Sequence, residues 1–136
     1  SEAAVAAWIA DPERIVLVGA AADAPETLLG YAMYETAAAP EAPVTERLGD
    51  VPAGHLSKLY VLAEGRGTGL AEALVHDGVE RLRRLGFRHV WLGTNAQNTR
   101  ANRFYERLGF ATIGARQFVV GGERVEDDWV RLLTVE

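Results

Sequence analysis

The sequence predicts a single mixed α/β domain over residues 1–136, in which helices pack on a mostly antiparallel sheet. Its 136 residues, 49% hydrophobic and 24% charged, have the size and balance of one soluble domain. Short β-branched runs alternate with segments of helical periodicity. A strand–helix–strand unit over residues 55–94 implies two parallel strands joined by a right-handed crossover, whereas the hairpins around it imply antiparallel flanks.

The N-terminal part predicts a helix followed by an antiparallel hairpin. Its elements are, in order, an alanine-rich helix over residues 2–10 that ends near Asp11-Pro12, a strand over 14–20, a turn over 23–26 and a strand over 28–35. Residues 36–52 contain three prolines and few large apolar side chains, which predicts a long loop. For this loop a plain surface connection is favoured over a flap that covers a cleft.

The middle of the chain predicts a strand, a glycine-rich turn and a helix. Alternation in the strand over 55–62 places four side chains on one face: His55, Ser57, Leu59 and Val61. After the turn at 65–69, a helix ended by Gly86 carries an apolar stripe of Leu70, Leu74, Gly78, Leu82 and Leu85. The remaining elements are a strand over 88–94, a turn over 95–98, a helix over 99–108 closed by Gly109, and strands over 110–120 and 126–135 that join near Gly121-Gly122.

Composition excludes several classes of function. The chain has no cysteine, which excludes disulfides, a thiolate nucleophile and a cysteine-ligated metal; we expect no metal cofactor. A net charge of -5 disfavours a nucleic-acid partner and mildly favours a cationic substrate. No segment approaches the roughly 20 apolar residues that span a bilayer. The N-terminus lacks the basic flank of a signal peptide, so we expect a cytoplasmic protein without a membrane partner.

The turn at residues 65–69 has the features of an anion site. A strand that enters a helix through glycines leaves backbone N–H groups unpaired, and the helix dipole adds positive charge there. Gly67 and Gly69 lack a Cβ that would keep a phosphate away, and Arg66 adds a charge. The lysine of a P-loop is absent, and Leu70 and Glu72 stand where a dinucleotide fingerprint needs glycine. A plain tight turn remains the alternative.

Two motifs resemble those of the GNAT family of N-acetyltransferases. Residues 59–74, with Arg66-x-x-Gly69-x-Ala71 between strand and helix, resemble its acetyl-CoA signature. Residues 98–110 resemble its second signature, Asn-x-x-Ala-x-x-Phe-Tyr-x-x-x-Gly-Phe. The resemblance covers about residues 15–133. It implies a sheet whose central parallel pair splays into a wedge for coenzyme A, with helices on both faces. Such domains begin with a strand and a helix that this chain is expected to lack or not to include.

The resemblance also implies site residues. The cofactor-binding set is Leu59, Val61, Arg66, Gly67, Thr68, Gly69, Leu70, Ala71, Asn98, Asn102 and Tyr105. Leu59 supplies a backbone N–H to the oxyanion, and Val61 pairs with pantetheine through its backbone. Spacing places Asn98, Asn102 and Tyr105 on one helix face, and Tyr105 is the expected acid for the leaving thiolate. His55, directly or through water, or Glu64 is the candidate base for the amine.

Each of these roles has a plainer alternative. Asn98 is also a good helix N-cap, Tyr105 a half-buried aromatic and His55 a histidine with satisfied hydrogen bonds. A weaker resemblance, through Val90-Trp91-Leu92-Gly93 and later glycines, is to the spermidine/spermine N-acetyltransferase branch, from which His55 and Ser57 depart.

The expected acceptor is therefore a polyamine, another small amine or a protein amine. The alternative function is an acyl-CoA sensor without turnover. Without the first strand of such domains, one edge of the sheet would be open, and a second copy of the chain could cover it. We therefore also expect a homodimer.

Overall fold

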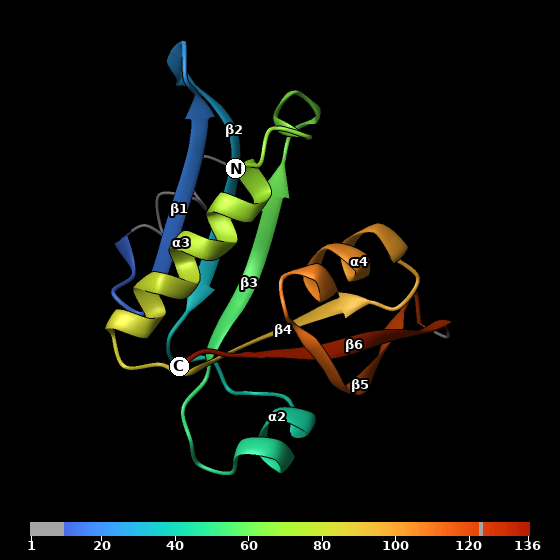
Figure 1. Ribbon diagram of the computed structural model, residues 1–136. Coiled ribbons are helices and arrows are strands. Elements are labelled where there is room, and N and C mark those ends of the chain that lie inside the picture. The colour runs from blue at the N-terminus through green and yellow to red at the C-terminus, as the bar shows by residue number, and fades with distance from the viewer. Residues whose placement is uncertain (1–9, 123) are drawn as a thin grey trace. The chain divides into compact units, whose positions relative to one another are not determined.

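The computed structural model describes residues 10–122 and 124–136, which form two compact units (Figure 1). The first unit runs to Ala38 and resumes over Gly54–Gly86, and the second comprises Ala39–Ala53 and Phe87–Glu136. The helix predicted over residues 2–10 lies outside the described residues, except for its last residue. Six strands and three α-helices in the described residues confirm the predicted mixed α/β class.

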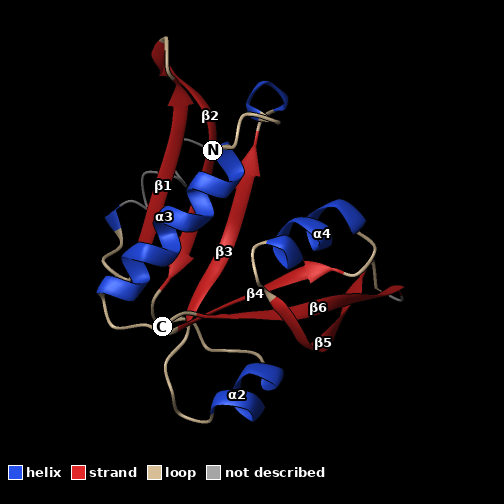
Figure 2. Cartoon of the chain, in the orientation of Figure 1, coloured by secondary structure: helices blue, strands red, loops and turns tan. Residues whose placement is uncertain are grey.

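The first unit is a three-stranded antiparallel sheet with a helix across it (Figure 2). Its elements are β1 (Arg14–Ala21), β2 (Ala24–Glu35), β3 (Gly54–Val61), the short 3-10 helix η1 (Ala63–Gly65) and α3 (Leu70–Arg84). The predicted hairpin is confirmed, with β2 in the centre. The predicted turn over 23–26 is wrong, because β2 begins at Ala24 and pairs there with Ala21, which leaves Ala22 and Asp23 as the turn.

Helix α3 buries the predicted stripe against this sheet, where Leu74, Gly78 and Leu82 are all buried. The Tyr34 hydroxyl donates to the carbonyl oxygens of Leu74 (2.9 Å) and Val75 (3.2 Å). A Cβ at Gly78 would lie 2.0 Å from the Tyr34 ring, so the ring occupies the space that glycine leaves. The predicted stripe is wrong at one position: Leu85 is 62% exposed, because it caps the end of α3.

A β-bulge in β3 overturns the predicted face of that strand. Met33 pairs with Lys58 and Tyr34 pairs with Leu56, so Ser57 is an extra residue without a partner position in β2. A single extra residue exchanges the faces of everything that follows it in a strand.

The bulge separates His55 from the later residues of β3. Leu59 lies opposite Ala32, which is two residues from Tyr34 and therefore shares the α3 side of the sheet with it. His55 lies opposite Glu35, on the other face. The prediction that His55 shares a face with Leu59 and Val61 is therefore wrong.

The second unit is also a three-stranded antiparallel sheet. Its elements are α2 (Ala42–Leu48), β4 (His89–Asn95), α4 (Thr99–Arg107), β5 (Ala111–Val120) and β6 (Arg124–Thr134). Strand β6 lies between β4 and β5 and pairs with both. The predicted strands and the predicted helix over 99–108 are confirmed to within one or two residues. Gly109, with φ +97°, follows α4 as expected for a glycine that ends a helix.

Helix α2 is a correction to the loop predicted over residues 36–52. Pro43 lies in its first turn, where the missing N–H costs nothing, and Gly49 with φ +61° ends it. Val44 is 1% exposed and packs in a core cluster with Trp91 and Val130. The segment is therefore neither a plain connection nor a flap, because one valine fixes it to the sheet of its own unit. A seven-residue helix with a single buried side chain has too little periodicity to be recognised in a sequence.

Candidate functional site

The glycine turn between β3 and α3 requires glycine at two positions. Gly67 has φ +75° and Gly69 has φ +85°, in the left-handed region that side chains disfavour. Gly69 is also the N-cap of α3, without a side-chain hydrogen bond to the helix end. A Cβ at Gly67 or Gly69 would meet nothing within 4 Å. The glycines therefore serve the shape of the turn and leave its outer side open.

The backbone N–H groups of this turn point to a binding role. Among residues 10–122 and 124–136, no hydrogen-bond acceptor is found for the N–H of Gly67, Thr68, Gly69 or Ala71. The Leu70 N–H makes only a long bond of 3.4 Å to the Thr68 hydroxyl. That hydroxyl itself donates to the Gly65 carbonyl, which holds the turn in place. The helix dipole adds positive potential at the same end of α3.

The charges around the turn are mixed. Arg66 is exposed, as expected of a residue that meets a phosphate, while Glu64 and Glu72 flank the turn with negative charge. Leu59 and Val61 lie beyond the bulge in β3, opposite Ala32 and Gly30 of β2. The first unit thus brings together the backbone positions predicted to hold the cofactor, at one end of β3 and the start of α3.

His55 lies in a row of charged side chains on the other face of this sheet. Its Nδ1 is 3.1 Å from Glu35 Oε1, and the other oxygen of Glu35 is 3.7 Å from Arg14. Arg14 in turn lies 3.3 Å from Asp11. Glu35 is not among the site residues that the sequence predicts. Its pairing with His55 follows from the cross-strand register, which the bulge sets and the sequence pattern does not show.

Two asparagines of the second unit are used within the protein. The Asn98 side chain accepts a hydrogen bond from the Ala101 N–H (3.1 Å), so it is the N-cap of α4. Asn102 Nδ2 donates to the carbonyl oxygens of Asn95 (3.0 Å) and Asn98 (2.9 Å). The Asn102 bonds fix the start of α4 to the end of β4. The N-cap role of Asn98 is the plainer alternative that the sequence left open for it.

Tyr105 contacts two phenylalanines, Phe104 on α4 and Phe110 directly before β5. Its ring makes edge contacts with Phe104 (centroid distance 5.3 Å) and Phe110 (5.8 Å). Desolvation by burial raises the pKa of Tyr105 to about 12, since burial disfavours the charged phenolate. Its hydroxyl has no hydrogen-bond partner within the part of the chain that the structure describes. The phenol therefore stays protonated at neutral pH and keeps its hydrogen available to donate.

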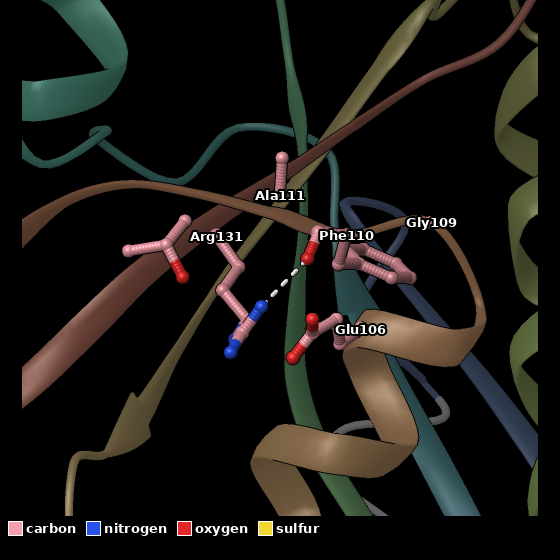
Figure 3. A pocket seen from close by; sticks show the side chains of 6 residues that line it. Glu106, Gly109, Phe110, Ala111 and Arg131 are labelled. Carbon is pink, nitrogen blue, oxygen red and sulfur yellow. Dashed lines mark hydrogen bonds between the residues drawn. The ribbon is translucent and has the colours of Figure 1, made fainter.

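Sequence reasoning missed Arg131, a buried arginine on β6. It lies at the inner wall of a pocket of about 380 Å³ between α4 and the strands, and Figure 3 shows its guanidinium beside Phe110 with Glu106 across the same space. Its Nε donates to Asn102 Oδ1 (3.1 Å). An isolated arginine in a strand carries no signal of burial in a sequence, so only the structure reveals it.

Other kinds of site find no support in the described residues. They contain no group of three or more histidine, aspartate or glutamate side chains that could hold a metal ion. None of their helices is long and apolar enough to cross a membrane.

Comparisons with known proteins identify the family. The sequence matches the acetyltransferase (GNAT) family over residues 1–110. An uncharacterized N-acetyltransferase of Mycobacterium bovis is 37% identical over 130 residues, which span 96% of this chain and 73% of that protein. The chain is also similar to two solved structures. One is the ribosomal-protein-S18-alanine N-acetyltransferase of Escherichia coli (TM-score 0.71, 20% identity, 99% of this chain and 77% of that one). The other is the NatC complex bound to Gag peptide and CoA (TM-score 0.73, 19% identity, 100% and 80%).

These matches agree with the two sequence motifs, with the mixed α/β fold and with a glycine turn whose N–H groups lack acceptors among the described residues. The chain therefore belongs to the GNAT family of acetyl-CoA-dependent N-acetyltransferases.

Proposed function

We propose that this acetyltransferase moves the acetyl group of acetyl-CoA directly to a primary amine, with the pyrophosphate of the cofactor held at the glycine turn. The observation that carries the proposal is the set of N–H groups at Gly67, Thr68, Gly69 and Ala71, which have no acceptor among the described residues. Charge-assisted bonds from such groups to phosphate are strong, and the dipole of α3 adds to them. Arg66 and Leu70 complete the phosphate side of the site.

The thioester lies, in this proposal, along β3 beyond the bulge. The Leu59 N–H stabilises the oxyanion that forms when the amine attacks the carbonyl carbon, and the Val61 backbone pairs with the pantetheine arm. A wedge between β3 and β4 to admit that arm stays a prediction, as does the action of residues 1–136 as one domain. The Asn98 side chain uses its oxygen to cap α4, and in this proposal its Nδ2 donates a hydrogen bond to the pantetheine. Asn102 serves to place α4, because its amide already makes three bonds within the protein.

Tyr105 is the proposed acid for the leaving sulfur. When the C–S bond breaks, the thiolate receives the phenolic proton. The amine nitrogen releases a proton to a base or to water, and the phenolate regains a proton from that base or from water, so that Tyr105 is restored and no net charge is left. Dry surroundings raise the pKa of the phenol and of the thiol alike, because both are neutral when protonated. The proton transfer then costs about what the ordinary pKa values of a phenol and a thiol give. They differ by roughly 1.5, which corresponds to about 2 kcal/mol.

The proposed base is His55, with Glu64 as the other candidate and a water relay as the simplest case. Glu35 lies within 3.1 Å of His55 Nδ1, which favours the tautomer that carries its proton there. The acceptor is a polyamine, another small amine or a protein amine. The net charge of -5 supports a cationic acceptor. The solved neighbours act, by their names, on a protein alanine and bind a peptide.

Thiol release from acetyl-CoA in the presence of an amine panel tests this function. We expect release with at least one amine, and Tyr105→Phe should lower kcat by about 100-fold or more, the usual contribution of an acid catalyst. The acetyl-CoA KM should change little. If calorimetry shows that the protein binds acetyl-CoA but no amine of the panel leads to thiol release, the alternative function of an acyl-CoA sensor is supported instead. Light scattering tests the proposed homodimer, and a monomeric mass would remove it.

A further inference from the structure

Arg131 is a buried cation whose hydrogen-bond acceptors among the described residues are neutral, and the Glu106 carboxylate lines the same pocket without forming an ion pair with it. It is 5% exposed, in the central strand β6 of the second unit. Its Nε donates to Asn102 Oδ1 (3.1 Å) and its Nη1 to the Phe110 carbonyl (2.8 Å). None of the ion pairs in the described parts of the chain includes it. Its hydrogen bonds therefore act on backbone and amide groups rather than on a counter-charge.

The first of these partners controls the start of α4. Asn102 uses its oxygen for Arg131 and both of its N–H groups for the carbonyl oxygens of Asn95 and Asn98. Asn95 ends β4, and Asn98 caps α4. Arg131 thus fixes the rotamer of a side chain that joins the end of β4 to the start of α4.

The second partner controls the end of α4. The Phe110 N–H donates to the Tyr105 carbonyl (3.0 Å), and the Phe110 ring, fully buried, contacts the Tyr105 ring. The guanidinium donates a hydrogen bond to the Phe110 carbonyl oxygen (Figure 3). One planar group therefore binds both Asn102, the fourth residue of α4, and Phe110, three residues beyond its last residue, which a shorter or single-headed cation cannot do.

If Arg131 only filled space in the core, its burial would be energetically unfavourable. A buried guanidinium loses its hydration, and an apolar side chain of similar volume would fill the same place without that loss. What the guanidinium adds is direction, because two of its N–H groups bond at fixed angles to Asn102 within α4 and to the Phe110 carbonyl after it. The residue on α4 whose position matters most to the proposed chemistry is Tyr105.

We propose that Arg131 is a positioning residue that holds α4, and with it the Tyr105 hydroxyl, in place for proton transfer to the departing sulfur. This inference rests on the proposed function, in which Tyr105 is the acid. A displacement of about 1 Å can lower a rate about 100-fold. Because the proposed phosphate site lies on the other unit, Arg131 should influence kcat far more than the binding of acetyl-CoA.

The test is a double-mutant cycle between positions 131 and 105. Arg131→Lys keeps the charge but reaches only one of the two partners, so kcat should fall by about 10- to 100-fold. The acetyl-CoA dissociation constant should change little. In a Tyr105→Phe background the same change should lower kcat no further, since the acid is already gone. Arg103→Lys, on the exposed side of α4, is the matched control and should leave kcat unchanged.

A second variant covers the case in which Arg131→Lys does not fold, as judged by circular dichroism. Asn102→Ala keeps Arg131 and removes the tie at the start of α4, and it should give the same pattern in the cycle. Losses of kcat that add fully to that of Tyr105→Phe, or an unchanged kcat in folded variants, overturn the positioning role while the proposed function stands. Wild-type protein without thiol release overturns the proposed function itself.

Discussion

Replacing Gly69 by alanine should separate the cost of folding from the cost of cofactor binding, because the chain carries a matched control. Gly69 and Gly86 lie at the two ends of α3, with φ +85° and +100°, and a Cβ at either would meet nothing within 4 Å. Each alanine therefore adds the same strain and no clash. Only Gly69 belongs to the turn proposed to hold the pyrophosphate.

The expected magnitudes follow from this geometry. An L-residue in the left-handed region costs about 1–2 kcal/mol, and the stiffer unfolded chain returns about half a kcal/mol. We expect each variant to lose about 1 kcal/mol, which lowers Tm by about 3–5 °C for a chain of this size. At Gly69 the added methyl also keeps the phosphate from the N–H groups. Loss of one bond to a charged group is worth about 1.5–3 kcal/mol, which should raise the acetyl-CoA KM by about 10- to 100-fold.

Thermal unfolding by circular dichroism and thiol release at varied acetyl-CoA measure the two effects on the same samples. Tm should fall by a similar amount in Gly69→Ala and Gly86→Ala, and the acetyl-CoA KM should rise in Gly69→Ala alone. That result would support a phosphate site at the glycine turn. Equal KM values in the two variants would refute the phosphate site at this turn. An unchanged Tm in both would refute the argument from backbone strain.

Three further predictions concern stability. Gly78→Ala should destabilise by about 1–3 kcal/mol in urea unfolding, although alanine favours helices, because its methyl would lie 2.0 Å from the Tyr34 ring; a gain would contradict this packing. Val44→Ala should cost about 2 kcal/mol by removing a valine that is 1% exposed beside Trp91, and a neutral result would mean that α2 is not anchored. Folded Tyr105, with its pKa near 12, keeps a proton that the unfolded chain loses above pH 10, so stability should fall as pH rises from 10 towards 12. At pH 11 wild type should lose about 1.4 kcal/mol relative to Tyr105→Phe in unfolding experiments, and parallel pH profiles would exclude the shift.

Local signals in the sequence were sufficient for most of the elements. The hairpin of β1 and β2, the helices that begin at Leu70 and Thr99, and the glycines that end them were all predictable, because alternation, helical periodicity and left-handed glycines act over a few neighbouring residues. The family was equally accessible, since Arg66-x-x-Gly69-x-Ala71 and the motif ending at Phe110 are continuous stretches of chain.

Helix α2 was not predictable for a physical reason. Its seven residues bury only Val44, and their helical state depends on a pocket formed by Trp91 and Val130, which lie far along the chain. Intrinsic propensity is weak over so short a segment, so the long-range contact decides.

Chain composition and short motifs thus determined the fold class, the family and the position of the glycine turn that is proposed to bind phosphate. Tertiary structure alone decided which side chains stand beside one another. The bulge at Ser57 moved His55 to the face of Glu35, because one extra residue inverts a strand. Arg131 became a buried support of the helix that carries Tyr105, because burial is a property of the packed chain and not of any segment of it.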